Sequence, residues 1–268
     1  MSEVHTETEI VAAQSPPAAP VPVPKKRLHS QHINTLQSLA ITVVIAVFVV
    51  TFIVQAFQIP SESMEHTLLI GDYLLVDKAH YGHSQFWDWL LPYRPIRHQD
   101  IVVFRYPVNP QQHFVKRVVG VPGDRIRLIN KHVYVNGEPQ ADSYAAFNWG
   151  QHDKFRDNFP NGGILGDRTT PSWFARAQKL TEEGQLIVPQ GYYFVLGDNR
   201  DDSYDSRYWG LVPEENIVGR PLVIYWSMPR NRSATDDTAQ SDRLSTLAYS
   251  LMQSFKGLRW NRMFRVPN

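Results

Sequence analysis

The longest apolar run of the chain lies near its N-terminus. Residues 39–54 read LAITVVIAVFVVTFIV, and no charged residue occurs between positions 36 and 57. A helix rises about 1.5 Å per residue, so about 20 such residues cross a hydrocarbon core of about 30 Å. The β-branched residues of this run would also suit a buried strand, but the run is too long for one. We therefore predict a transmembrane helix over residues 36–57.

A removable signal peptide is the alternative to a permanent anchor, because residues 54–56 (VQA) resemble a small-residue cleavage site. The apolar run is longer than the usual core of about 7 to 15 residues, and a polar segment precedes it. This pattern favours an uncleaved anchor and leaves self-cleavage open. Basic residues stay on the cytoplasmic side, and KKR at 25–27 precedes the run whereas acidic residues follow it. We expect a cytoplasmic N-terminus and an external domain after residue 57.

Beyond this run, short segments rich in β-branched and aromatic residues predominate. Those typical of strands are YLLVDK, DIVVFRYP, FVKRVVGV, DRIRLIN, KHVYVNG, GYYFVLGDN and GRPLVIYWSM. Turn signals separate them, among them Pro-Gly-Asp at 122–124 and Asn136-Gly137. Between residues 59 and 228 we find no helix-period stretch of useful length. The expected fold is mainly β, an antiparallel β-sheet domain with one transmembrane helix before it.

Composition and periodicity distinguish further segments of the chain. Residues 1–35 contain PPAAPVPVP and are predicted to be a disordered cytoplasmic tail. Residues 140–185 have weak periodicity and are expected to form an insertion or second subdomain of the β-rich domain at 58–228. Residues 229–268 are expected to be a linker and an amphipathic segment that lies on a membrane or packs on the β domain. FWDWLLPY at 86–93 is expected either at the membrane interface or in the core.

Composition and missing motifs narrow the chemistry. The chain has no cysteine, which excludes disulfides, thiolate catalysis and cysteine-ligated metal sites. The formal net charge of +1 gives no general attraction to nucleic acid. A glycine-rich phosphate loop, an HExxH motif and a Gly-x-Ser-x-Gly elbow are all absent from the sequence, and HYGH at 80–83 is weak evidence for a metal. We therefore expect neither a cofactor nor a metal.

A serine and a lysine remain as candidates for catalysis. Ser63, in the stretch PSESM, closely follows the predicted helix, so its hydroxyl is expected within about 20 Å of the bilayer. Lys116 alternates with Phe114 and Val118 along a predicted strand, where apolar neighbours would desolvate its ammonium. Lowering its pKa from about 10.4 to about 8 costs about 3 kcal/mol and yields an amine that can take the Ser63 proton. The alternative is a surface lysine that snorkels to water.

A third stretch, GDNRDDSYDSRYWG at 197–210, concentrates Asp, Asn, Ser and Arg after a predicted strand. It is either a solvated turn or a packed polar network that orients an amine, and the closing Tyr-Trp-Gly favours packing. Together with PSESM, DIVVFRYP and FVKRVVGVPGD, in this order over about residues 57–228, it resembles the conserved boxes of bacterial type I signal peptidases. These are the serine–lysine leader peptidases.

The resemblance implies roles for individual residues. Ser63 would be the nucleophile and Lys116 the general base. The Ser61 hydroxyl and the Ser63 N–H would form the oxyanion hole, while Ser203 and Asp205 would support the general base. The residues implied to be structural members of the site are Met64, Asp198 and Arg207.

By the same resemblance the chain is expected to be a membrane-anchored serine endopeptidase that removes N-terminal signal peptides through an acyl-enzyme. Its partners would be the lipid bilayer and exported preproteins with Ala-x-Ala-like cleavage sites, with no nucleic acid and no metal. The chain would lie in the bacterial cytoplasmic (inner) membrane and cross it once, with the catalytic domain on the outer face. Two alternatives stay open: a dedicated Ser–Lys peptidase that matures one secretion or pilus substrate, and a catalytically degenerate membrane-anchored binding domain.

Two positions depart from the pattern of the family. His66 stands where a proline is usual, and we expect it to change loop rigidity or pH response without loss of the chemistry. His98-Gln99-Asp100 stands where Arg-Gly-Asp is usual. The missing glycine matters only if the backbone at Gln99 has a positive φ.

Overall fold

The computed structural model describes residues 28–81, 93–147, 150, 152–161, 165–229 and 257–267. The chain forms two compact units, residues 1–45 and 46–268. Helix α1 (Leu28–Phe48) continues as a π-helical turn over Val49–Ile53. Within α1 and this π-helical turn, residues Ile33–Thr51 form a 19-residue span of mean hydropathy 2.2, which is long and apolar enough to cross a membrane.

The apolar helix ends earlier than the predicted boundary at residue 57. Val54–Gln58 form strand β1, which pairs antiparallel with β2 (Asp72–Asp77). The strand is uncharged like the helix before it, so hydropathy alone cannot separate the two. The hydrogen bonds to β2 decide the conformation, and β2 begins 14 positions after β1 ends, outside the apolar run.

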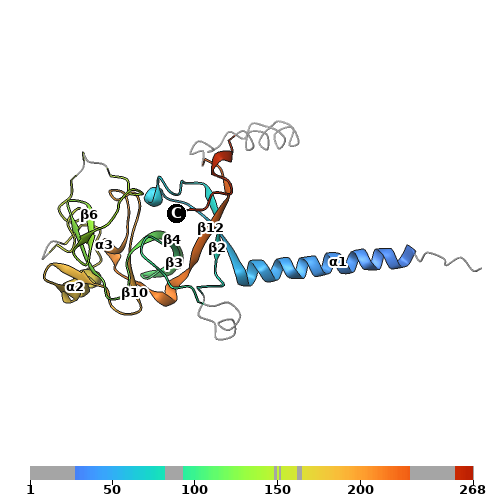
Figure 1. The fold of residues 1–268 in the computed structure, drawn as a ribbon, viewed down its shortest axis with the longest axis horizontal. Helices are drawn as coiled ribbons and strands as arrows, with labels where there is room; N and C mark the ends of the chain where they lie inside the picture. Colours follow the sequence, from blue (N-terminus) through green and yellow to red (C-terminus); the bar gives the residue numbers. More distant parts are fainter. Residues whose placement is uncertain are drawn as a thin grey trace, which may run out of the picture. The chain divides into compact units, whose positions relative to one another are not determined.

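Two antiparallel sheets form the β unit (Figure 1). The larger sheet has the strand order β1-β2-β12-β3-β4-β10-β11, and the smaller has the order β7-β6-β5-β9-β8. The other strands of the larger sheet are β3 (Ile101–Tyr106), β4 (Asn109–Gly120), β10 (Tyr192–Leu196), β11 (Val212–Pro213) and β12 (Ile217–Ser227). Those of the smaller are β5 (Arg125–Ile129), β6 (His132–Val135), β7 (Glu138–Pro139), β8 (Thr181–Glu182) and β9 (Gln185–Ile187). The prediction of a mainly β, antiparallel fold is confirmed.

Two-residue turns shape the smaller sheet. Asn130-Lys131, Asn136-Gly137 and Glu183-Gly184 each have positive φ at both positions and join neighbouring strands. Such turns match the right-handed twist of the strands, and Asn and Gly adopt them at low cost. The turn signal at Asn136-Gly137 therefore works as its residue types suggest.

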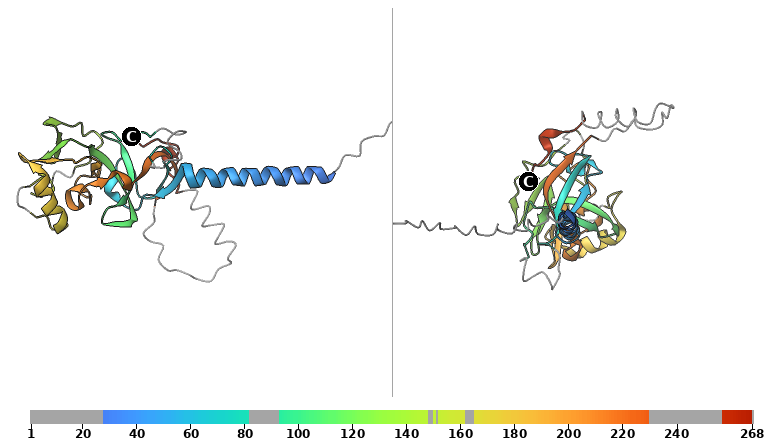
Figure 2. Two further views of the ribbon diagram at one scale, coloured as in Figure 1. Left: turned by 90° about the horizontal axis from the view of Figure 1, so that it is seen from below. Right: turned by 90° about the vertical axis from the view of Figure 1, so that its right-hand side faces the viewer.

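The second subdomain is larger than the predicted insertion at 140–185. It also contains β5, β6 and β7, which lie before residue 140. Helix α2 (Pro171–Leu180) belongs to it as well, in the range 59–228 where the sequence shows no helix-period stretch of useful length. The helix buries only Trp173 and Ala177, one turn apart, which is too short an apolar pattern to recognise in the sequence. Figures 1 and 2 place α2 and the smaller sheet at one end of the β unit, and β2 with β12 at the other.

Strand β3 separates two apolar cores. Val102 and Phe104 contribute to the larger cluster, while Ile101 and Val103 contribute to the smaller one. Successive side chains of a strand point to opposite faces, so β3 is buried on both. Met64 belongs to the smaller cluster and is 1% exposed, and burial of such a side chain contributes about 1.5 to 3 kcal/mol. It anchors the turn that carries Ser63.

The end of the chain folds back on the larger sheet. The Phe264 N–H donates to Ile224 O at 2.7 Å, and the Ile224 N–H donates to Arg265 O at 2.9 Å. Of the predicted amphipathic segment, only the last residues are described, and Leu258 is buried. The rest of that segment lies outside the described residues, as does 86–93 apart from Tyr93.

Candidate active site

Ser63 and Lys116 meet although 53 positions separate them. Ser63 lies in the short 3-10 turn Glu62–Met64, and Lys116 lies on β4. Lys116 Nζ is hydrogen-bonded to Ser63 Oγ at 2.5 Å. The lysine is 4% exposed, so the alternative of a snorkelling surface lysine is wrong. The two groups that the sequence singles out are thus in direct contact.

The surroundings of Lys116 favour its neutral form. Its pKa lies at about 8 instead of 10.5, mainly because burial lowers it; the Asp205 and Asp198 carboxylates act to raise it, and the Arg207 guanidinium acts to lower it. Among the described residues, neither carboxylate makes an ion pair with Lys116, since each is held by an arginine. A fraction of the amine is therefore unprotonated near neutral pH and is able to accept a proton.

A cavity of about 520 Å³ opens beside the pair. It runs between residues 57–64 and residues 113–116 of β4, with Arg168 and Tyr204 also on its wall. Ser61 lines it, and Ser61 Oγ lies 3.4 Å from Ser63 Oγ. Ser61 and Ser63 thus lie on one wall of the cavity, and Lys116 lies on the other.

Asp205 and Ser203 are the two residues expected to support the general base. Asp205 is fully buried and accepts hydrogen bonds from Arg207 Nε at 2.9 Å, Arg207 Nη2 at 2.8 Å and the Gly197 N–H at 3.1 Å. Burial acts to raise the pKa of Asp205, but Arg207 and the Gly197 N–H outweigh it, so the pKa lies below its ordinary value. Ser203 Oγ also helps to lower that pKa, although it has no partner of ordinary hydrogen-bond geometry among the described residues.

Gly197 packs tightly between Ser203 and the turn that carries Ser63. A Cβ at this position would clash with Ser203 Oγ and with the Ser63 carbonyl oxygen. The absence of a side chain lets the strand end of β10 press against the turn that carries Ser63. Next to it, the Asn199 N–H donates to Ser63 O at 3.2 Å.

A second buried ion pair ties β4 to the same region. Arg117 Nε and Nη2 donate to Asp198 at 2.8 and 2.7 Å, and Arg117 Nη1 donates to Gln99 O at 2.8 Å. Thr67 Oγ1 donates to Asp198 Oδ2 at 2.6 Å. Sequence reasoning placed Asp198 in the site but missed Arg117 and Thr67. The position of Arg117, adjacent to Lys116 on a strand, is the signal that could have found it.

Both departures from the family pattern have left-handed backbones. His66 has φ of 84° and Gln99 has φ of 67°. Proline is fixed near φ of −65° and cannot occupy His66 without rearrangement of the loop. At Gln99 the condition set by the sequence is met, because φ is positive where the usual residue is glycine.

Replacing Gln99 by glycine is expected to raise the free energy of unfolding by about 1 kcal/mol, because a non-glycine residue pays about 1 to 2 kcal/mol for this conformation. The backbone bonds of Gln99 to Val118 and Arg117 are kept. Urea unfolding of the full chain in detergent measures the change. Gln178→Gly on α2 is the matched control and should lose about 1 kcal/mol. A decrease for Gln99→Gly contradicts the prediction.

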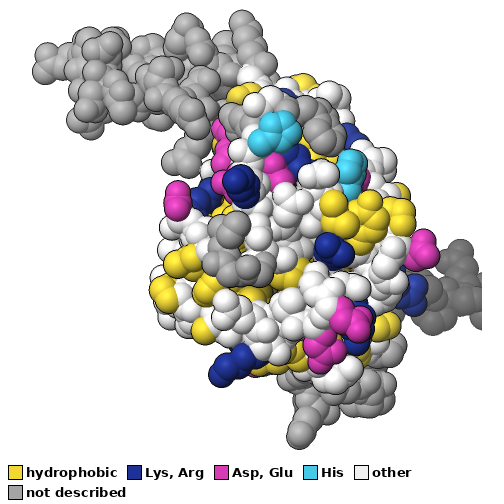
Figure 3. All heavy atoms as spheres, turned by 90° about the vertical axis from the view of Figure 1, so that its left-hand side faces the viewer, with side chains coloured by type: hydrophobic (Ala, Val, Ile, Leu, Met, Phe, Trp, Pro, Cys, Tyr) yellow, Lys and Arg dark blue, Asp and Glu magenta, His cyan; other side chains and the backbone are white. Residues whose placement is uncertain are grey.

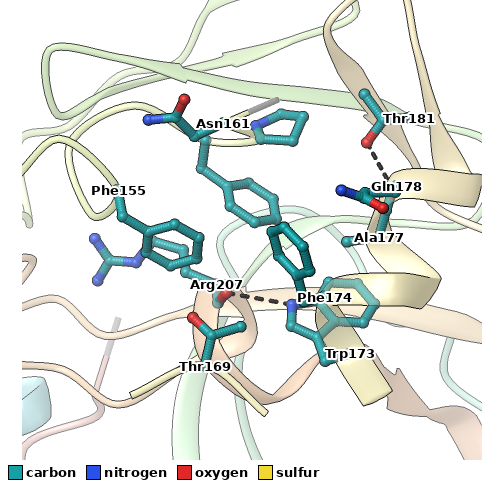
Figure 4. Close-up of a pocket in the computed structure, with 11 residues that line it drawn as sticks. Phe155, Asn161, Thr169, Trp173, Phe174, Ala177, Gln178, Thr181 and Arg207 are labelled. Carbon is teal, nitrogen blue, oxygen red and sulfur yellow. Dashed lines mark hydrogen bonds between the residues drawn. The ribbon is translucent and has the colours of Figure 1, made fainter. Parts of the chain in front are cut away.

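A smaller cavity of about 150 Å³ lies in the second subdomain (Figure 4), and the described residues that line it do not include Ser63 or Lys116. Aromatic side chains of α2 and of the loop near residues 155–160 line it, and Trp173 Nε1 donates to Arg207 O. The face shown in Figure 3 mixes charges of both signs with apolar side chains among the described atoms. Arg207, which lines the smaller cavity, also acts on the pKa of Lys116.

Comparisons with known proteins identify the family of the chain. The family model described as signal peptidase, peptidase S26, matches residues 32–226. A signal peptidase I of Pseudomonas aeruginosa is 36% identical over 195 residues, 67% of each chain. A signal peptidase I of Aquifex aeolicus is 36% identical over 220 residues, 70% of this chain and 82% of the relative. The crystal structure of a signal peptidase I from Enterococcus faecalis covers 47% of this chain and 97% of its own, with 30% identity and a TM-score of 0.36.

A family model that spans most of the chain and relatives at this identity and coverage establish the assignment. The chain belongs to the signal peptidase family, peptidase S26, and is a serine hydrolase of the signal peptidase type.

Proposed function

We propose that the chain is a membrane-anchored endopeptidase that cuts signal peptides from exported preproteins, with Ser63 as nucleophile and Lys116 as general base. One observation carries the proposal: Lys116 Nζ lies 2.5 Å from Ser63 Oγ. The burial that lowers the pKa of Lys116 to about 8 supports it, since a general base works best with a pKa near the operating pH.

In the proposed mechanism, neutral Lys116 takes the proton of Ser63 Oγ as this oxygen attacks the carbonyl carbon of the scissile bond. The developing oxyanion accepts hydrogen bonds from the Ser63 N–H and the Ser61 hydroxyl. When the carbon–nitrogen bond breaks, protonated Lys116 gives its proton to the leaving amine, and an ester to Ser63 remains. Lys116 then takes a proton from water, which attacks the ester; as the bond between the carbonyl carbon and Ser63 Oγ breaks, Lys116 gives this proton to Ser63 Oγ, and the new carboxyl end leaves.

The other predicted site residues serve this pair by position. Asp205 holds the end of β10 through the Gly197 N–H, and its charge is balanced by Arg207. Ser203 Oγ packs closely against Gly197. Asp198 ties β4 to the loop after Ser63, through Arg117 and Thr67. Met64 fixes the turn that carries Ser63 in the smaller core. These contacts support a rigid pair, which general-base catalysis needs.

The anchor would hold this site close to the membrane. The apolar span ends at Thr51, twelve positions before Ser63, so at most about 40 Å of chain connects them. This exceeds the 20 Å predicted from the sequence, because the span ends earlier than residue 57. The basic residues at 25–27 favour a cytoplasmic N-terminus and an external active site in a bacterial cytoplasmic membrane. Signal peptides, which leave the same bilayer, would meet Ser63 there.

The test uses the full chain in proteoliposomes and several unrelated preproteins with Ala-x-Ala junctions. We expect cleavage after the second alanine, identified by mass spectrometry, and no cleavage by Ser63→Ala. Preproteins with both alanines replaced by leucine should resist. Cleavage of only one substrate would indicate the dedicated peptidase, and no cleavage of any would indicate the degenerate binding domain.

A further inference from the structure

The loop between Ser63 and β2 is held by residues from the far end of the chain. Arg262 Nη2 donates to Thr67 O at 2.9 Å, and Arg259 Nη2 donates to Ile70 O at 2.5 Å. Both arginines lie at the 3-10 turn Trp260–Arg262, almost 200 positions after the loop. Their guanidinium groups satisfy carbonyl oxygens that a loop cannot pair by itself.

We call the contacts of Arg259 and Arg262 with this loop the clamp, and Asp72 is its third member. It is fully buried and accepts from Arg262 Nη2 at 2.6 Å and from Ser227 Oγ at 2.6 Å. It also accepts from the Leu69 N–H at 2.9 Å. Arg262 Nε and Nη2 donate to the two carboxylate oxygens of Asp72, at 3.3 and 2.6 Å, and Nη2 also donates to Thr67 O. A planar guanidinium makes this two-nitrogen contact, and the single nitrogen of an ammonium does not.

Thr67 connects the clamp to the nucleophile. Its carbonyl is bound by Arg262, and its hydroxyl is bound by Asp198. The Thr67 and Leu68 N–H groups both donate to Met64 O, so residues 64–68 form consecutive closed turns. A shift at Thr67 is thus passed to Met64 and to Ser63 before it.

We propose that Arg262 is a positioning residue of the active site, and that the docked C-terminal segment 257–267 holds the Ser63 loop opposite Lys116. The inference rests on the proposed role of Ser63 as nucleophile. Arg262 contacts neither Ser63 nor Lys116 in any described bond, and it acts only through the loop. A displacement of about 1 Å in such a loop is enough to slow catalysis by about 100-fold.

The test compares Arg262→Gln with Arg262→Lys and with Arg265→Gln, whose side chain is exposed, in the full chain. Activity is measured at a temperature where circular dichroism shows every variant folded. We expect Arg262→Gln to lower kcat by about 10- to 100-fold with little change in KM. Arg262→Lys should fall between it and the wild type, and Arg265→Gln should match the wild type.

The pH profile of kcat/KM distinguishes a positioning role of Arg262 from a general loosening of the fold. If Arg262 only positions Ser63, the acidic limb of kcat/KM stays where the wild type has it, because the Lys116 pocket is intact. A limb displaced toward the pKa of a free lysine contradicts the proposal, as does a folded Arg262→Gln with wild-type kcat. If Arg262→Gln does not fold, Arg262→Lys is used instead, and a displaced acidic limb or a wild-type kcat of that variant contradicts the proposal. Failure of the proposed function appears separately, as no cleavage by the wild type.

Discussion

Lys116→Met is expected to lower kcat/KM by at least about 10⁴-fold, because Ser63 then has no group to take its proton. The same variant is expected to be more stable than the wild type near pH 7. Folding holds the pKa of Lys116 at about 8, below that of the unfolded chain, so protonation of the unfolded chain opposes folding. Removing the amine should raise the free energy of unfolding by up to about 3 kcal/mol below pH 8. The gain should vanish above about pH 10.5.

Denaturant unfolding across pH, together with peptide cleavage, measures both effects. Lys179→Met, on the exposed face of α2, is the matched control and should change neither. Lys116→Arg keeps a positive charge but cannot be deprotonated, so it too should be inactive. An active Lys116→Met, or one that is inactive only because it unfolds, would contradict the assignment of this residue.

Arg207→Met is expected to lower the free energy of unfolding by about 3 to 5 kcal/mol, because it leaves the fully buried Asp205 carboxylate without its partner. The arginine also donates to Arg156 O and Arg200 O, so its loss frees two carbonyl groups as well. Near the active site, Arg207 acts to lower the pKa of Lys116 and Asp205 acts to raise it. The acidic limb of the pH–rate profile should therefore move to higher pH.

The double variant Asp205→Asn with Arg207→Met distinguishes a lost ion pair from lost packing. It removes both charges, so much of the stability should return, and the acidic limb should move back toward lower pH. If the double variant is as unstable as Arg207→Met alone, the cost lies in the side-chain volume and the carbonyl partners and not in the buried charge. Unfolding in urea and the pH dependence of kcat/KM decide between these outcomes.

The sequence indicates the chemistry of the site through local features. Alternation along β4 predicts that Lys116 shares a face with apolar residues, and the polar stretch after β10 predicts a packed network. Both follow from a period of two residues and from the need of buried polar groups for partners. The contact between Ser63 and Lys116 depends on a sheet order that joins strands distant in sequence, and only the resemblance to a family implied it.

Three features could not be predicted, for different physical reasons. Strands β5 to β7 alternate like the strands of the larger sheet, so their membership in the smaller sheet depends on pairing with β9. Helix α2 shows too few buried residues for a period to emerge. No local pattern in the sequence indicates the contacts of Arg262. The loop and the end of the chain are joined there by side-chain bonds to carbonyl oxygens and one carboxylate, which need no periodic arrangement of residues.

Whether Lys116 can act as the general base depends on its protonation state, which a nuclear magnetic resonance titration of the ¹³C-labelled lysines measures, with Lys116→Arg to assign the signal. We expect the Lys116 signal to titrate with a midpoint near pH 8. The acidic limb of kcat/KM, measured on the same protein, should have the same midpoint. A Lys116 signal that titrates near 10.5, with a rate that follows some other group, would rule out Lys116 as the general base.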